Sequence, residues 1–248
     1  MKNKRRTMLF VSGNRPKLVQ ESSVFGADAV VFDLTNGVED SEKDCARILV
    51  KEAIDFLDFS NVEVIVKINS LDSEFGVKDV EIISKVKPSA IMVSKASEDQ
   101  IKKIDSMLAK LERQEGFEEK AIKLIPTIET AYALEDIQNI ISASERINAV
   151  FFDAEGLASD IDMERTKGGE EILYARSRVA MVCRVAGINA IDTYFVDAND
   201  YEGLEKDSQK AKSLGFTGKA AVDGRQIDTI QTIFVNRQEM RLVIWKTS

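Results

Sequence analysis

The chain has 248 residues, a formal net charge of −8, two cysteines and no histidine. Without histidine there is no Ser-His-Asp or Cys-His catalysis, no imidazole base and no histidine metal ligand. Two cysteines cannot build a structural zinc site or a disulfide framework. A bound metal must therefore be held by oxygen, as is typical of magnesium, manganese or calcium, and proton transfer must use a carboxylate, lysine, tyrosine, cysteine or water.

The bulk properties also limit the partners and the compartment. The negative charge disfavours general binding to nucleic acid. No apolar run approaches the roughly 20 residues of a membrane span, and Met8–Val11 is shorter than the apolar core of a signal peptide, about 7–15 residues. We therefore expect a cytoplasmic protein with reduced thiols and with no nucleic-acid or membrane partner.

Short apolar runs alternate with longer helical segments along the whole chain. The predicted strands are Thr7–Ser12, Asp28–Leu34, Glu63–Asn69, Ala90–Ser94, Ile122–Ile128, Ala149–Asp153, Ala190–Thr193 and Gly218–Val222. The predicted helices follow Pro16 and cover about Ser41–Phe56, Val77–Val86, Glu98–Leu111, Ala131–Ser142, Ile172–Ala186, Tyr201–Leu214 and the residues from Arg225 onward.

Eight β-then-α units without a dividing linker predict one domain over residues 1–248, a (β/α)8 TIM barrel. A doubly wound open sheet gives the same alternation with fewer strands. The glycine-rich fingerprints GxGxxG and GxxxxGK[ST] are absent, so nucleotide binding by a Rossmann fold loses its best support. Pro126 lies inside the fifth strand and removes a ladder hydrogen bond there, which predicts a bulge or a strand end.

Polar residues gather at the carboxyl ends of the predicted strands, where the active site of a barrel lies. They are Asp33, Asn36, Lys67, Asn69, Lys95, Glu129, Thr130, Asp153, Glu155, Asp192, Asp223 and Arg225. Several acids with two lysines at one mouth suit an oxygen-ligated divalent metal beside an anionic substrate.

The strand-end acids have a second interpretation, because such residues also cap the following helix. Capping is favoured for Asp192 and Asp223. For Asp33, both capping and a functional role are open. For Glu129, the alternatives are metal binding and a capping or helix-dipole role.

Three further segments have alternatives. Lys67 points either into the barrel or toward the helices, and an inward lysine is costly unless it is paired, which favours a role. Gly156–Glu170 is either a mobile lid or a solvated loop. The basic start of the chain, which includes Arg6, is either solvated or a contact for an anionic substrate.

An ordered set of motifs indicates a family. The segments RRTMLFVSGNRPKL, GADAVVFDL, VKIN, LIPTIETA, FFDAEGLASDI and KAAVDGRQI follow one another along the chain. They resemble RRSxLFVPGxxP, GADAVILDLED, VRIN, LIPLIETA, FGAEDLAADLG and KAAIHPRQI of the citrate lyase β-subunit-like family, within the HpcH/HpaI aldolase group. The resemblance covers nearly the whole chain.

This resemblance implies a (β/α)8 barrel that forms homo-oligomers, usually homotrimers. It also implies a magnesium-dependent lyase that cleaves a citryl-, malyl- or citramalyl-type thioester, carried on CoA or an acyl carrier protein. The products are a 2-oxo acid and an acetyl thioester, and other lyase subunits are implied partners. Family members also run further at the C-terminus, into a segment of which this chain has little.

Residue by residue, the resemblance gives the following roles. Glu129 matches a metal ligand, and Asp33 matches the first acid of DLED, near the reaction centre. Lys67 stands in place of a substrate-binding arginine, so it is expected to act in catalysis and in substrate binding. Apart from the resemblance, Asn69 and Lys95 at the strand ends and Arg6 in the basic start of the chain complete the expected substrate contacts.

The departures from the family fall on the chemistry. Thr35 and Asn36 replace two acids, and Gly156 replaces the second metal ligand. Asp153, three residues upstream, is the hypothesised substitute ligand. Asp223 stands where the family has histidine.

Three hypotheses result. The first is a divalent-metal lyase of this family. The second is a member that has lost catalysis and acts as a binding or complex-forming subunit. The third is a metal-free Schiff-base aldolase that uses Lys67 or Lys95.

Overall fold

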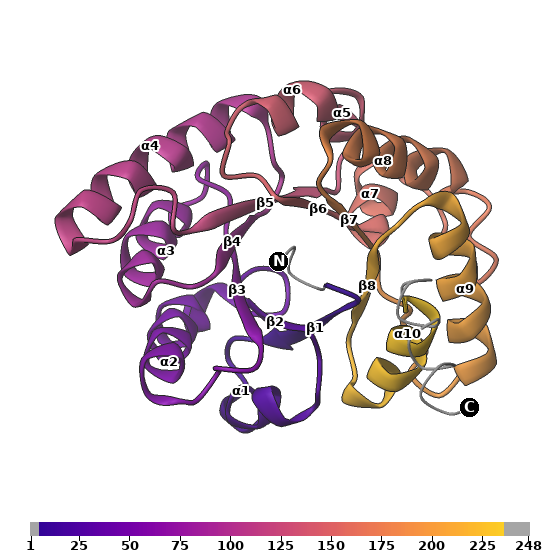
Figure 1. Cartoon of the computed structure of the whole chain (residues 1–248), viewed down its shortest axis with the longest axis horizontal. Coiled ribbons are helices and arrows are strands. Elements are labelled where there is room, and N and C mark those ends of the chain that lie inside the picture. The colour runs from indigo at the N-terminus through magenta and orange to yellow at the C-terminus, as the bar shows by residue number, and fades with distance from the viewer. Residues whose placement is uncertain (1–4, 236–248) are drawn as a thin grey trace, which may run out of the picture.

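In the computed structural model, which describes residues 5–235, eight parallel strands close into a barrel in sequence order. Figure 1 shows the strands around the centre and the helices outside them. The strands are β1 (Thr7–Ser12), β2 (Ala29–Asp33), β3 (Glu63–Ile68), β4 (Ala90–Val93), β5 (Lys123–Ile128), β6 (Ala149–Phe152), β7 (Asn189–Asp192) and β8 (Gly218–Ala221). The prediction of a (β/α)8 barrel is confirmed, and the open sheet is excluded because β1 pairs with β8.

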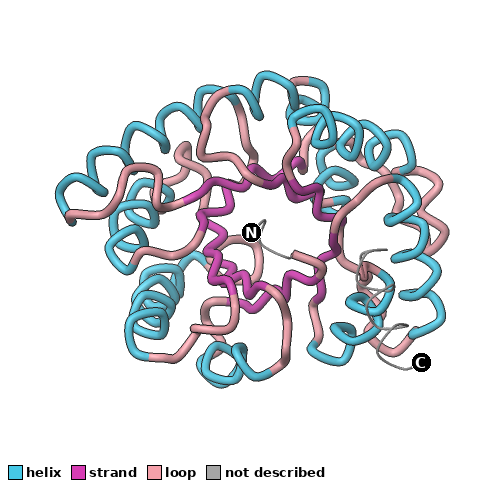
Figure 2. Tube along the Cα trace, in the orientation of Figure 1, coloured by secondary structure: helices cyan, strands magenta, loops and turns pink. Residues whose placement is uncertain are grey.

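The helices form the outer ring, which the tube in Figure 2 separates from the strands and loops. They are α1 (Pro16–Glu21), α2 (Lys43–Phe56), α3 (Gly76–Ile83), α4 (Glu98–Glu115), α5 (Ala131–Glu135), α6 (Ile137–Ser142), α7 (Ala154–Asp160), α8 (Leu173–Ala186), α9 (Tyr201–Leu214) and α10 (Ile227–Ile233). Short 3-10 turns cover Ser22–Val24, Asp40–Glu42, Ser84–Val86 and Gly224–Gln226.

Strand side chains alternate between two apolar layers, as the period of two requires. One layer faces the helices. The other fills the barrel interior with Met8, Ala29, Val31, Ile65, Ala90, Met92, Ile125, Ala149, Phe151, Ile191 and Ala220. On several strands, the next residue that points inward, two positions further along, is a polar residue at the carboxyl end of the strand. The alternation therefore directs a small set of charged side chains into the barrel mouth.

Pro126 lies within β5, opposite a local irregularity of the neighbouring strand. Leu124 is bridged to Ile147, and the regular pairing resumes at Thr127 with Phe151. Three steps on one strand therefore match four on the other, so one extra residue is accommodated on the β6 side. This is the geometry of a bulge, and it is where the missing N–H of Pro126 is tolerated.

Two helical predictions need correction. The segment predicted over Ala131–Ser142 is two helices, α5 and α6, which meet at Asp136. The segment Gly156–Glu170, predicted as a lid or loop, begins inside a helix, because α7 covers Ala154–Asp160. The helix α7 was not predicted because it is short and contains a glycine. Among residues 5–235, no helix is long and apolar enough to cross a membrane.

A buried ion network ties α4 to the start of β5. Arg146, with no exposed side-chain surface, makes two hydrogen bonds of 2.7 Å to Glu112. Glu112 also accepts from the backbone N–H groups of Lys120 and Ile122. Burial opposes ionisation, but these donors, Arg146 first, hold the pKa of Glu112 below its ordinary value.

This lowered pKa predicts a pH dependence of stability. A depressed folded-state pKa stabilises the fold fully above the unfolded value of about 4.3, and this stabilisation is lost as the pH falls through the folded value. Glu112→Gln should therefore be less stable than the wild type at pH 7, with the difference shrinking below about pH 4. Urea unfolding at several pH values measures this, and a difference independent of pH would contradict it.

Candidate active site

Four charged side chains lie on the inward positions at the barrel mouth: Asp33, Lys67, Glu129 and Asp153. The Nζ of Lys67 is 4.0 Å from an oxygen of Asp33 and 3.7 Å from one of Asp153. Lys67, Glu129 and Asp153 are 3%, 5% and 2% exposed, whereas Asp33 is only partly buried. The structure therefore brings together the two predicted catalytic residues and the two predicted metal ligands.

The loop after β2 orients Asp33. Its Oδ1 accepts a hydrogen bond of 2.7 Å from the backbone N–H of Thr35 and one of 2.6 Å from the Thr35 hydroxyl. The other oxygen faces Lys67. Thr35, which replaces a family acid, thus supports the carboxylate of Asp33. This arrangement caps a turn and leaves one oxygen available, so the two interpretations of Asp33 coexist.

Asp153 begins α7 and faces the cluster at the same time. Its Oδ1 accepts from the backbone N–H of Gly156 at 3.1 Å, which makes Asp153 the N-cap of α7. The hydroxyl of Tyr194 lies 3.4 Å from the same oxygen. The Oδ2 of Asp153 faces Lys67.

Glu129 is held by the loop after β4. Its Oε1 accepts a 2.6 Å hydrogen bond from the backbone N–H of Lys95. Lys95 has a left-handed backbone with φ of 47°, and its side chain is exposed at the mouth. Thr130, not Glu129, caps α5. Burial raises the pKa of Glu129, and the nearby ammonium of Lys67 offsets this only in part.

The charge state of Lys67 follows from its surroundings. Burial alone lowers the pKa of a lysine, but Asp33, Glu129 and Asp153 outweigh it and hold the pKa of Lys67 above its ordinary value. The side chain is therefore an ammonium ion with no free electron pair for attack on a carbonyl. This geometry disfavours the Schiff-base hypothesis for Lys67.

Tyr194 is a site residue that the sequence analysis missed. It packs with Phe10 and Phe151, at centroid distances of 6.2 and 6.5 Å, below the charged cluster. Burial, followed by the negative charges of Asp153 and Glu155, raises its pKa, so the phenol stays protonated. Tyr194 lies just beyond the end of β7. The alternation of strand residues no longer predicts there which way a side chain points, so the sequence did not indicate Tyr194.

Asn69 lies at the end of β3 but serves the framework. Its amide nitrogen donates to the carbonyl of Leu34 and to Asp79, and its oxygen accepts from the Nζ of Lys43 at 2.8 Å. These contacts hold the loops after β2 and β3 together. Since both ends of the amide are engaged with protein, the structure does not present Asn69 to a substrate as predicted.

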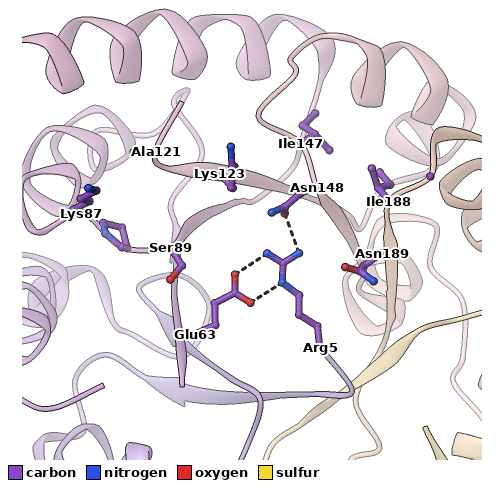
Figure 3. A pocket seen from close by; sticks show the side chains of 12 residues that line it. Arg5, Glu63, Lys87, Ser89, Ala121, Lys123, Ile147, Asn148, Ile188 and Asn189 are labelled. Carbon is purple, nitrogen blue, oxygen red and sulfur yellow. Dashed lines mark hydrogen bonds and ion pairs between the residues drawn. The ribbon is translucent and has the colours of Figure 1, made fainter. Parts of the chain in front are cut away.

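Arg6 lies at the opposite end of the barrel from the charged cluster. It precedes β1 and binds Asp28, which precedes β2, at 2.7 Å. The adjacent Arg5 points between Glu63 and Asn148, as Figure 3 shows. Arg5, Glu63 and Asn148 line a cavity of about 580 Å³ at the amino ends of the strands. Because the mouth is at the carboxyl ends, the structure does not bring Arg6 to the predicted substrate site.

The two capping predictions have different outcomes. Asp223 caps the turn at Gly224–Gln226, and its hydrogen bonds with Arg225 lower its pKa. Asp192 does not cap a helix, and that prediction is wrong. It is fully buried on the helix-facing side of β7, where it pairs with Arg176 at 2.9 Å and Lys219 at 2.6 Å. Asp192 follows inward-facing Ile191, so alternation turns it outward.

Gly156 lies directly against the cluster. A Cβ added at Gly156 would lie 2.7 Å from the Cβ of Glu129 and 3.1 Å from its Oε2. Real Cβ atoms essentially never approach so closely, so an aspartate at this position requires Glu129 to move. The glycine thus both removes a carboxylate from the mouth and makes room for Glu129 in its present position.

Comparisons with known proteins agree with this architecture. The HpcH/HpaI aldolase/citrate lyase family matches residues 6–224. The chain is 35% identical over 231 residues to citrate lyase subunit beta of Leuconostoc mesenteroides subsp. cremoris, covering 93% of this chain and 76% of that protein. It is 29% identical over 245 residues to mitochondrial citramalyl-CoA lyase of Rattus norvegicus, covering 95% and 72%.

A solved structure shows the same fold. The citrate lyase beta subunit complexed with oxaloacetate and magnesium, from M. tuberculosis, superposes with a TM-score of 0.78 at 23% identity, covering 93% of this chain and 97% of that one. The match of fold, the family match over most of the barrel and the 35% identity agree with one another. The chain belongs to the HpcH/HpaI aldolase/citrate lyase family.

Proposed function

We propose that the protein is a carbon–carbon lyase that cleaves a hydroxyacyl thioester, on CoA or an acyl carrier protein, into a 2-oxo acid and an acetyl thioester. The observation that carries this proposal is the cluster of Asp33, Lys67, Glu129 and Asp153 at the mouth of the barrel. The relatives named as citrate lyase subunit beta and citramalyl-CoA lyase support the reaction class.

The cleavage needs a base and a positive charge. A carboxylate takes the proton of the substrate hydroxyl, whose carbon becomes the 2-oxo group. The bond to the α-carbon of the thioester breaks, and its electron pair forms the thioester enolate. A proton then returns to that carbon and gives the acetyl thioester. We assign the base to Asp33, because it is the most exposed acid of the cluster.

The other residues position the substrate. The ammonium of Lys67 faces the negative charge of the substrate, and Glu129 and Asp153 hold this ammonium in place. The exposed side chain of Lys95, at the rim of the mouth, supplies a second cation for a substrate carboxylate. Tyr194 donates a hydrogen bond beside Asp153.

Magnesium was expected as the cofactor, with Glu129 and Asp153 as ligands, but the described residues fit this ion poorly. Asp33, Asp153 and Glu129 each use one oxygen for protein donors, and Lys67 lies among them. Within residues 5–235, no three or more acidic or cysteine side chains are placed to hold a metal. The proposed cleavage therefore uses groups of the chain alone.

A direct assay tests the proposed lyase. Purified protein is incubated with citryl-, malyl- and citramalyl-CoA and with the corresponding acyl-carrier-protein thioesters, and the 2-oxo acid is measured through a coupled dehydrogenase. Turnover of at least one thioester is expected. Absence of turnover with all of them would favour the second candidate, a binding or complex-forming subunit that associates with other lyase subunits. The changed mouth residues Thr35, Asn36 and Gly156 favour that alternative.

We further propose that the chain forms homo-oligomers in the cytoplasm. The outer face of α8 exposes Tyr174, Met181 and Val185, the last 90% exposed. Such an apolar stripe on a helix is typical of a subunit interface. Cys45 and Cys183 are both free, in keeping with a reducing compartment.

The oligomer proposal predicts the behaviour of a charged variant. Met181→Asp/Val185→Asp should shift the mass measured by sedimentation from that of an oligomer toward 27.6 kDa. The matched control is Val77→Asp, an exposed valine on α3. A monomeric wild type, or an unchanged mass in the double variant, would contradict the proposal.

A further inference from the structure

We infer that the ammonium of Lys67 takes the place of a divalent metal ion, so that the positive charge of this active site is built into the chain. This inference rests on the proposed lyase function and specifies its chemistry. It starts from the disagreement between the magnesium in a solved structure of the same fold and the donor atoms of this chain.

The ammonium of Lys67 occupies the centre of the acidic cluster. Lys67 comes from an inward position of β3, and its Nζ lies 4.0 and 3.7 Å from oxygens of Asp33 and Asp153. A divalent ion held by these acids would have to share the space with an ammonium ion. Repulsion between two cations a few ångströms apart in a buried site opposes binding of the ion while Lys67 is charged.

Each acid of the cluster already uses one oxygen for a hydrogen bond within the protein. The Oδ1 of Asp33 accepts from Thr35, the Oδ1 of Asp153 caps α7, and the Oε1 of Glu129 accepts from the N–H of Lys95. Each acid is thereby left with one oxygen, and in Asp33 and Asp153 that oxygen faces Lys67. Magnesium binds through one or two carboxylate oxygens and several waters. On Asp33 and Asp153 it would have to take oxygens that already face the ammonium of Lys67.

Gly156 packs too closely against Glu129 to carry a side chain. A side chain there would collide with Glu129, because its Cβ would lie 2.7 Å from the Cβ of Glu129. The backbone N–H of Gly156 instead donates to Asp153. The position that could provide another carboxylate is therefore used for close packing, and no fourth acid joins the three around Lys67.

A titration of the wild type with a divalent ion tests the inference. Mn²⁺ binding followed by electron paramagnetic resonance, and Mg²⁺ binding followed by calorimetry, are expected to show no site with a Kd below about 1 mM. A wild-type site tighter than about 0.1 mM that is lost in Glu129→Gln would overturn the inference.

A matched pair of variants sharpens the test. Lys67→Met removes the internal cation and is expected to bind Mn²⁺ at least tenfold more tightly than the wild type. Lys95→Met removes one exposed positive charge at the same mouth and is expected to change the affinity less than threefold. Equal effects of the two variants, or a folded Lys67→Met protein with no gain, would overturn the inference.

Folding and activity are controlled separately. Circular dichroism checks the variants, and Lys67→Gln replaces Lys67→Met if the latter does not fold. If the wild type is an active lyase, its turnover is expected to survive 5 mM EDTA within twofold, whereas a loss of more than tenfold that Mg²⁺ restores would overturn the inference. If no thioester is cleaved, the lyase proposal fails, and the ion titrations still decide the role of Lys67.

Discussion

Replacing Asp33 with asparagine is expected to lower kcat for thioester cleavage by roughly 10²–10⁴-fold, the usual contribution of a general base. The variant keeps an oxygen that can accept from Thr35, so the loop after β2 should stay in place. It loses the ionised oxygen that faces the mouth and Lys67. The substrate hydroxyl then has no carboxylate to take its proton. Steady-state kinetics, with circular dichroism to check folding, measures the effect.

The control for this prediction is Asp223→Asn. Asp223 is also an acid after the carboxyl end of a strand, but its carboxylate binds Arg225 and a turn N–H rather than the cluster. Its kcat is expected to remain within about twofold of the wild type, because a partly exposed charge that is paired with Arg225 outside the cluster has little influence on the reacting atoms. Equal losses in both variants, or a folded Asp33→Asn protein with wild-type kcat, would show that Asp33 is not the base.

Replacing Arg146 with alanine is expected to reduce the free energy of unfolding by about 3–5 kcal/mol, because one partner of a buried ion pair is left uncompensated. Arg146 binds Glu112 through two nitrogens and also Asp105 at 2.6 Å. Glu112 is 1% exposed. Its carboxylate would remain in the core with only backbone donors. Urea unfolding monitored by fluorescence or circular dichroism measures the change, and Tm should fall by roughly 10 °C.

An exposed ion pair on the same helix provides the comparison. Lys102 and Glu98 pair at positions i and i+4 of α4, with side chains 56% and 40% exposed. Lys102→Ala is expected to cost only about 0.3–0.5 kcal/mol, since water and salt screen such pairs. If Arg146→Ala costs no more than Lys102→Ala, the network between α4 and the start of β5 does not stabilise the fold as argued.

The strands were predictable from the sequence because a parallel barrel strand is buried on both faces. Each such strand is a short, continuous apolar run, and all eight observed strands fall on predicted runs, with ends that differ by at most one residue. Helix ends were less accurate. Asp136 divides one predicted helix, and α7 was missed altogether, since a glycine-containing helix of only seven residues has little helical periodicity.

The candidate site was predictable where the alternation of a strand continued to its end. Asp33, Lys67 and Asp153 follow inward residues by two positions, and they meet in the mouth. Tyr194 and the framework contact of Lys43 with Asn69 were not predictable in this way, because they depend on loops beyond the strands. The substrate contact predicted for Arg6 is not present at the mouth, because Arg6 precedes its strand and lies at the other end of the barrel.

The amino-acid sequence by itself determined the barrel, the family resemblance and the exclusion of imidazole chemistry, of a structural zinc site and of a disulfide framework. These depend on composition, on local periodicity and on motif order, all of which can be read along one chain. Only the tertiary structure decided which charges meet. Lys67 acquires its partners from β2, β5 and β6, which are 34, 62 and 86 residues away at Asp33, Glu129 and Asp153. The closure of the sheet sets these distances, and they determine that the cation at the centre of the acids is an ammonium of the chain.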